Sequence, residues 1–128
     1  MNDFFNYKNN SKIYEVSWFD GDKKINIKSN NELIAFISKD HLFVVLENWN
    51  HKKLEVYSIN GIKIGDIAIP YDKFLYRGVN YCHLSITGLA VILVDKTELL
   101  IDNYADAFQA EIDIESLKIG KKLTSYRW

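Results

Sequence analysis

The side chains best suited to nucleophilic or acid–base chemistry are one cysteine and three histidines. Cys82 and His83 are neighbours in a stretch that we interpret as an apolar strand, where adjacent side chains point to opposite faces. A catalytic cysteine–histidine dyad needs both groups within hydrogen-bond reach, so this pair favours ordinary packing. His41 falls in a predicted turn and His51 in a polar loop. No nucleophile with an oriented base can be assembled from these residues, and we expect a protein that is not an enzyme.

Motifs for metal or phosphate binding are also missing from the sequence. It contains no glycine-rich phosphate loop, no Gly-x-Ser-x-Gly and no His or Cys pair at metal-ligand spacing. Asp20-Gly21-Asp22 and the segment 102–106 offer acidic oxygens, but neither has the ligand spacing of a calcium loop. We interpret the first as a hairpin turn and the second as a solvated insertion, and we expect no cofactor.

Acidic side chains are concentrated in one stretch of a nearly neutral chain. Seven acidic residues lie between residues 95 and 115 against one base, Lys96, although the net charge is only −1. A basic partner would explain this concentration, because complementary charge accelerates encounter and fixes register. The alternative is a solvated loop that keeps the protein soluble. The candidate partner-binding residues are Asp95, Glu98, Asp102, Tyr104 and Asp106.

Direct nucleic-acid binding is disfavoured by the same net charge, since nucleic-acid binders usually carry a strong basic excess. Four basic residues between Lys118 and Arg127, with aromatic neighbours, could clamp a single strand. We interpret them instead as charges that protect a sheet edge. Trp18 and Trp49 flank predicted turns, and both core packing and partner binding stay open for them.

Composition and turn signals indicate strands. Eight tyrosines, seven phenylalanines and three tryptophans suit a pleated surface, and one proline leaves little room for linkers. Asp20-Gly21-Asp22 separates two alternating runs, 12–19 and 23–28, which predicts a hairpin. Residues 1–11 show no periodicity, and we expect an irregular arm there.

An internal repeat organises the remaining chain. Leu42–Leu46 matches Leu89–Leu93, and Val56–Gly65, with its Asn60-Gly61 turn, matches Glu111–Gly120. If the repeat is structural, its alternating positions should point into a core. The predicted core positions are Val44, Leu46, Tyr57, Ile59, Val91, Leu93, Ile112 and Ile114.

Each copy of the repeat is expected to hold about four strands. The segment 32–38 could be a helical turn or a strand, but alignment with 82–86, before a predicted Thr87-Gly88 turn, favours a strand in both. We expect one domain, residues 1–128, made of an arm and hairpin (1–31), a first unit (32–70) and a second unit (81–123). Between the units, Tyr71–Asn80 is interpreted as a packed connection. The second unit also has an insertion, 96–109, which is either a short helix or a hairpin arm.

Two such units resemble successive blades of a β-propeller. The resemblance implies an all-β fold of two related antiparallel four-stranded sheets plus an N-terminal hairpin, arranged as an open propeller fragment or a sandwich. In size, strand content, acidic zone and lack of catalytic residues, the chain also resembles the immunity proteins of contact-dependent growth inhibition systems. That resemblance implies a bacterial protein that binds a cognate toxin, a basic RNase or DNase domain, and blocks its active site stoichiometrically.

The same resemblance implies a cytoplasmic protein that touches neither nucleic acid nor membrane. The first residues lack the basic and apolar segments of a signal peptide, and no apolar run approaches the ~20 residues that span a bilayer. The alternative function is a non-catalytic scaffold or subunit domain that binds another protein through its strand edges.

Overall fold

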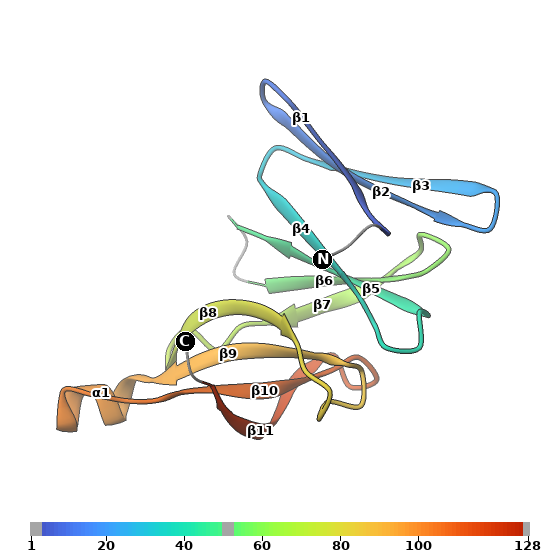
Figure 1. Ribbon diagram of the computed structural model, residues 1–128. Coiled ribbons are helices and arrows are strands. Elements are labelled where there is room, and N and C mark those ends of the chain that lie inside the picture. Colours follow the sequence, from blue (N-terminus) through green and yellow to red (C-terminus); the bar gives the residue numbers. More distant parts are fainter. Residues whose placement is uncertain (1–3, 50–52, 127–128) are drawn as a thin grey trace. The chain divides into compact units, whose positions relative to one another are not determined.

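The computed structural model describes residues 4–49 and 53–126 (Figure 1). The elements are β1 (Asn6–Asn10), β2 (Ile13–Asp20), β3 (Lys23–Ser29), β4 (Leu33–Ile37), β5 (Phe43–Asn48), β6 (Lys53–Ser58), β7 (Lys63–Ala68), β8 (Phe74–Tyr81), β9 (Leu89–Asp95), α1 (Lys96–Asp102), β10 (Ala107–Asp113) and β11 (Lys118–Tyr126). The described strands form three antiparallel sheets, β1-β2-β3, β4-β5-β6-β7 and β11-β10-β9-β8, and none closes into a barrel. The all-β prediction is confirmed.

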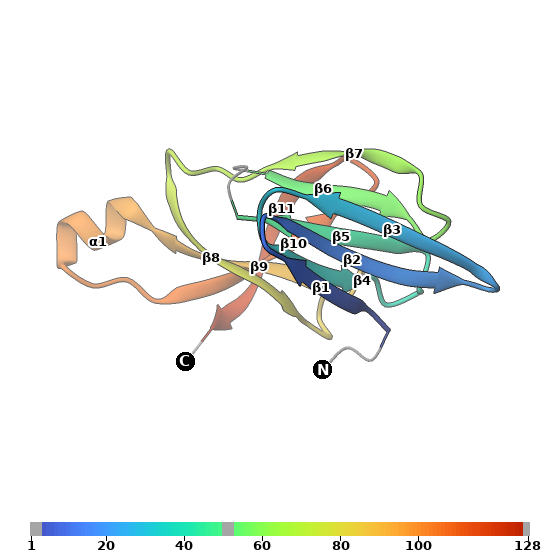
Figure 2. The same ribbon diagram turned by 90° about the horizontal axis from the view of Figure 1, so that it is seen from above.

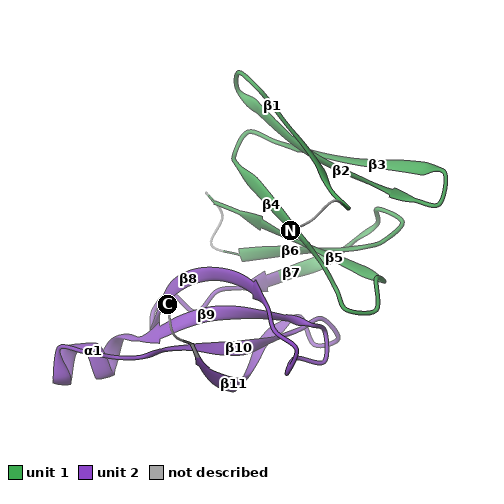
Figure 3. Cartoon of the chain, viewed as in Figure 1, with its two compact units in different colours: residues 1–66 green, residues 67–128 purple. Residues whose placement is uncertain are grey.

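Contacts divide the chain into two compact units, residues 1–66 and 67–128 (Figure 3). The boundary falls inside β7. The single-domain interpretation of the sequence stays a prediction. No helix among the described residues has the length and apolar character needed to cross a membrane.

The N-terminal sheet confirms the predicted hairpin and adds a strand to it. β2 and β3 pair from Tyr14↔Ser29 to Asp20↔Lys23 around the expected turn. The prediction of an irregular arm over residues 1–11 is wrong, because β1 pairs with β2 from Asn6↔Ser17 to Asn10↔Ile13. All five β1 residues are exposed, so this strand leaves no hydrophobic alternation in the sequence. It is held by the backbone of β2 and by the Tyr7 hydroxyl, which donates to the Ala35 carbonyl at 3.3 Å and accepts from Ala35 N at 3.1 Å.

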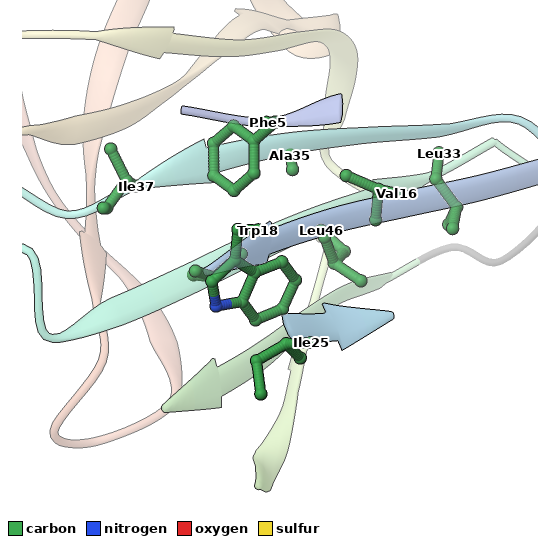
Figure 4. Close-up of a cluster of buried hydrophobic side chains, with 9 residues drawn as sticks. Phe5, Val16, Trp18, Ile25, Leu33, Ala35, Ile37 and Leu46 are labelled. Atoms are coloured by element: carbon green, nitrogen blue, oxygen red, sulfur yellow. The ribbon is translucent and has the colours of Figure 1, made fainter. Parts of the chain in front are cut away.

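The core of the first unit lies between the N-terminal sheet and the sheet β4–β7 (Figure 4). Trp18 is fully buried there and donates a hydrogen bond from Nε1 to the Ile59 carbonyl oxygen at 2.8 Å. Its role is therefore packing, and it joins the two sheets. Trp49 is 51% exposed, so partner binding stays open for that residue. The buried cluster comprises Phe5, Val16, Trp18, Ile25, Leu33, Ala35, Ile37, Val44 and Leu46.

The sheet β4–β7 matches the predicted first repeat unit. Its four strands run from Leu33 to Ala68, within the expected 32–70, and the predicted Asn60-Gly61 turn is present. Ser58 N donates to the Ile62 carbonyl at 2.9 Å, and Gly61 has φ 92°. A Cβ at Gly61 would lie 2.8 Å from Ile25 Cγ2. Glycine is thus required there both by the backbone conformation and by the approach of β3.

The sheet β8–β11 corrects the second repeat unit at its first strand. β8 occupies residues 74–81, of which 74–80 were predicted to be part of a connection. The segment 82–86, predicted to be a strand, belongs to a turn. In this turn, Cys82 N donates a hydrogen bond to the Gly88 carbonyl oxygen at 2.9 Å. The chain therefore reverses at Thr87-Gly88, as predicted. A bulge between Tyr76 and Gly78 interrupts β8, and it breaks the alternation by which a strand is recognised.

The remaining strands follow the repeat. β5 and β9 hold the two aligned apolar runs, and the two aligned hairpins are β6–β7 and β10–β11. Six of the eight predicted core residues are buried; Tyr57 and Ile59 are partly buried and pack against the core of the first unit. Val44 and Leu46 are buried like their equivalents in β9, so the two apolar runs correspond. The strand register differs between the copies, because Val44 pairs with Tyr57 whereas Val91 pairs with Ala110.

Candidate partner-binding surface

The insertion of the second unit begins with a helix. In α1, Asp95 is the N-cap, and its carboxylate accepts hydrogen bonds from Thr97 N at 2.8 Å and Glu98 N at 3.2 Å. Asn103 ends the helix in the left-handed conformation with φ 57°. The choice between a helix and a hairpin arm is thereby decided for residues 96–102. The sequence held a signal for it: an acidic N-cap followed three residues later by Glu98 resembles a capping box.

Helix α1 and its flanks form a projecting segment, residues 95–106, which we call the acidic arm. It extends past the adjoining ends of β9 and β10 in both views (Figures 1 and 2). None of the helical residues is buried, and Leu100 and Ile101 are 85% and 75% exposed. The helix does not extend through the whole insertion, because Ala107 is a buried residue of β10.

The base of the acidic arm is hydrogen-bonded to the segment that precedes β8. Lys96 N donates to the Lys73 carbonyl at 3.1 Å, and Lys96 Nζ donates to the Tyr71 carbonyl oxygen. At the other end, the Tyr104 hydroxyl donates to Asp106 Oδ1 at 2.5 Å. Capping and these bonds stabilise the arm, which contributes no buried helical residue.

Three of the predicted site residues converge on a groove beside the arm. Asp95, Glu98 and Asp106 line a space of about 490 Å³ together with Phe74, Phe108 and Lys122. The two phenylalanine rings meet edge to face with centroids 5.7 Å apart, and Lys122 Nζ lies 5.5 Å from the Phe108 centroid. The groove therefore combines aromatic walls with three carboxylates and one ammonium group.

The other two predicted site residues lie on the arm but do not line this groove. Asp102 is the exposed last residue of α1, and Tyr104 is 67% exposed. Sequence reasoning missed two residues of the same surface, Leu100 and Ile101, because apolar residues were assigned to packing.

Part of the acidic stretch, residues 95–115, has a structural role. Asp95 caps α1. Glu111 is buried, and its carboxylate accepts hydrogen bonds from Ser85 Oγ, from Ile86 N at 3.0 Å and from Thr87 Oγ1 at 3.1 Å. Asp113 accepts from Ser116, which holds the pKa of the Asp113 carboxyl below its ordinary value. The four remaining acids of this stretch are exposed: Glu98, Asp102, Asp106 and Glu115.

No catalytic arrangement comes together around the cysteine or histidines that the structure describes. Cys82 is buried with Sγ 3.5 Å from Gln109 Oε1, whereas His83 is exposed. His41 lies in a turn with φ 61°, and His51 lies outside the described residues. Across residues 4–49 and 53–126, no group of three or more His, Cys, Asp or Glu side chains is placed to hold a metal ion.

The basic C-terminal stretch lies on β11, an edge strand of its sheet. Lys118, Lys121 and Lys122 are all exposed, which is the placement that edge protection requires. Arg127 lies outside the described residues.

No family profile, no curated protein and no solved structure matches this chain.

Proposed function

We propose that this chain is a bacterial immunity protein that acts in the cytoplasm, where it binds a cognate toxin domain and blocks its active site stoichiometrically. The toxin that fits is a basic nuclease acting on RNA or DNA. The observation that supports the proposal is the acidic arm. It projects from its sheet and exposes carboxylates and large apolar side chains, yet its helix contributes no buried residue. An exposed element of this kind is typical of a protein-binding surface.

Inhibition by masking needs charge and shape but no reactive group. A nuclease holds its substrate largely through basic side chains that contact phosphate oxygens. Glu98, Asp102 and Asp106 are exposed carboxylates on a capped element, so they can pair with those basic side chains in place of phosphates. Pairs that become buried in the complex set the dissociation rate, and rim pairs set mainly the association rate. Tyr104 adds an apolar ring with a polar end to the contact.

A second candidate function is a non-catalytic scaffold that binds another protein through strand edges. One observation favours it: β1 is an edge strand whose five residues are all exposed. The backbone of an edge strand can accept an added strand. Salt separates the two functions, because charge-steered binding slows as ionic strength rises and strand addition depends little on it.

The proposal is tested with the protein encoded by the neighbouring open reading frame, which should carry a toxin module. Co-expression of this chain should protect cells from that protein, and the two purified proteins should form an equimolar complex. Asp102→Lys with Asp106→Lys replaces attractive contacts by repulsive ones, and it should weaken binding by about 2–5 kcal/mol. Folding stability should hardly change, because both residues are exposed and the hydrogen bond that Asp106 accepts from Tyr104 lies on the surface.

The matched control is Lys23→Glu with Lys24→Glu, two exposed residues at the β2–β3 hairpin. This variant should bind and protect like the wild type. Equal protection by the wild type and the Asp102/Asp106 reversal would move the interface away from the acidic arm.

A further inference from the structure

Two neighbouring aliphatic side chains on the acidic arm are not used by the fold. Leu100 and Ile101 are mostly exposed, and no residue of α1 is buried. Successive helical residues lie about 100° apart around the axis, so the pair covers a broad apolar stripe. Resting on the proposed function, we infer that Leu100 and Ile101 are the anchors of the interface and insert into an apolar pocket with a basic rim on the partner protein.

The arm presents these two side chains in a preorganised form. The Asp95 carboxylate caps the start of α1, and Asn103 ends it in the left-handed conformation. At the base, Lys96 is bonded through both its backbone nitrogen and its ammonium group to carbonyls of residues 73 and 71. Little conformational freedom is then lost when the stripe is buried, and this favours affinity.

The charges around Leu100 and Ile101 indicate which kind of partner binds there. Glu98 and Asp102 lie on the same helix and Asp106 follows it, while the last turn carries no base. None of these three carboxylates takes part in an ion pair among the described residues. A second copy docked arm to arm would bring like charges together, and an anionic membrane surface would repel the arm. An apolar protein pocket rimmed by lysine or arginine would bind the aliphatic side chains and also pair with the carboxylates.

This assignment separates two contributions to binding. Burial of the aliphatic pair is insensitive to salt, whereas pairing of exposed carboxylates is screened by it. Leu100→Ala with Ile101→Ala should raise the Kd for the toxin domain about 30-fold or more, by the same factor at low and high salt. The effect of Asp102→Lys with Asp106→Lys should shrink as salt rises. Alanine has the highest helix propensity, so the first variant keeps α1 helical.

The matched control is Ile62→Ala with Ile64→Ala, which removes two exposed aliphatic side chains from the first unit. The control should leave the Kd unchanged. If the wild type binds the toxin domain and the Leu100/Ile101 variant binds equally well, the proposed function stands and the anchor assignment is overturned. If no toxin is bound, the proposed function fails, and the partner chemistry is decided by a separate probe.

That probe is a synthetic amphipathic peptide of lysine and leucine, compared with one of glutamate and leucine, each titrated into the isotope-labelled full-length chain. The lysine peptide should shift the resonances of Leu100 and Ile101, and the glutamate peptide should not. Equal shifts with both peptides, or none with either, would overturn the basic-rimmed partner. Self-association in sedimentation that the alanine variant removes would assign a second copy instead. Binding to phosphatidylglycerol vesicles would assign a membrane, and it would also overturn the inference.

Discussion

Glu111 shows why charge alone does not identify a binding residue. It belongs to the acidic stretch, yet its carboxylate is buried and receives three hydrogen bonds from the turn between β8 and β9. Burying a carboxylate without hydrogen-bond donors would be strongly unfavourable. The three donors therefore compensate for the burial of Glu111, and the carboxylate in turn serves as their acceptor. The acids that remain for a partner are those that the fold leaves exposed.

Replacing Glu111 should therefore affect stability and not binding alone. Glu111→Ala removes the acceptor of Ile86 N and one acceptor of the Ser85 and Thr87 hydroxyls. It should lower the free energy of unfolding by about 1–3 kcal/mol. Glu115→Ala, at an exposed position of the same stretch, should change it by less than about 0.5 kcal/mol. Urea denaturation of both variants measures the difference. Equal stabilities would contradict the assigned role of Glu111.

Gly61 offers a second test at the residue scale. Gly61→Ala forces a side chain into a position with φ 92° and places its Cβ 2.8 Å from Ile25 Cγ2. We expect a loss of about 2 kcal/mol or more, from backbone strain and overpacking together. Gly21→Ala has φ 61° and open space around the new Cβ, so it should lose only about 1 kcal/mol. Thermal melts that show the same loss for both variants would exclude the contact with Ile25 as a cause.

At the scale of elements, an ion network joins β6 to β7. Asp66 is paired with Lys53 and Lys63, each at 3.0 Å, and Lys63 also lies 3.5 Å from Glu55. Burial alone would raise the pKa of Asp66, but hydrogen bonds from the two lysines outweigh it and lower that pKa. The hydrogen bond with Asp66 is also the main cause that raises the pKa of Lys63.

These shifts predict the direction of the pH dependence. The Asp66 contribution is present above its unfolded pKa of 3.8 and is lost as pH falls through the lower folded value. The Lys63 contribution is present below 10.5 and is lost as pH rises through the higher folded value. Because the side chains are more than a third exposed, Asp66→Asn should lower stability at neutral pH by about 1 kcal/mol or less.

Urea denaturation at neutral pH and below pH 3.8 checks this prediction. The difference in stability between wild type and Asp66→Asn should shrink in acid, since protonated Asp66 no longer forms the ion pairs. A difference that stays constant or grows in acid would contradict the network's role.

Strands with a continuous apolar run could be predicted from sequence, and irregular ones could not. Five of the six β5 residues and six of the seven β9 residues are buried. β8 escaped recognition because its bulge at Gly78 breaks the pattern, and β1 because it is polar throughout. Both strands depend on pairing with a neighbour, a tertiary interaction that a local pattern does not record.

At the scale of the whole chain, the repeat predicted two related sheets, and the structure has them together with a third sheet of three strands. Of the candidate site, sequence correctly located the insertion and its exposed acids. It did not distinguish the capping Asp95 from the exposed Asp102, because both are aspartates in one run. It also missed Leu100, since exposure of an apolar residue depends on whether another element covers it.

The most direct test of the central claim is amide hydrogen exchange of the full-length chain with and without the toxin domain encoded beside it. Binding through the acidic arm predicts slower exchange at residues 95–106 and at the strand ends that support them, and unchanged exchange along β1 and β3. Protection confined to the strand edges, with residues 95–106 unaffected, would contradict the claim and favour the scaffold function.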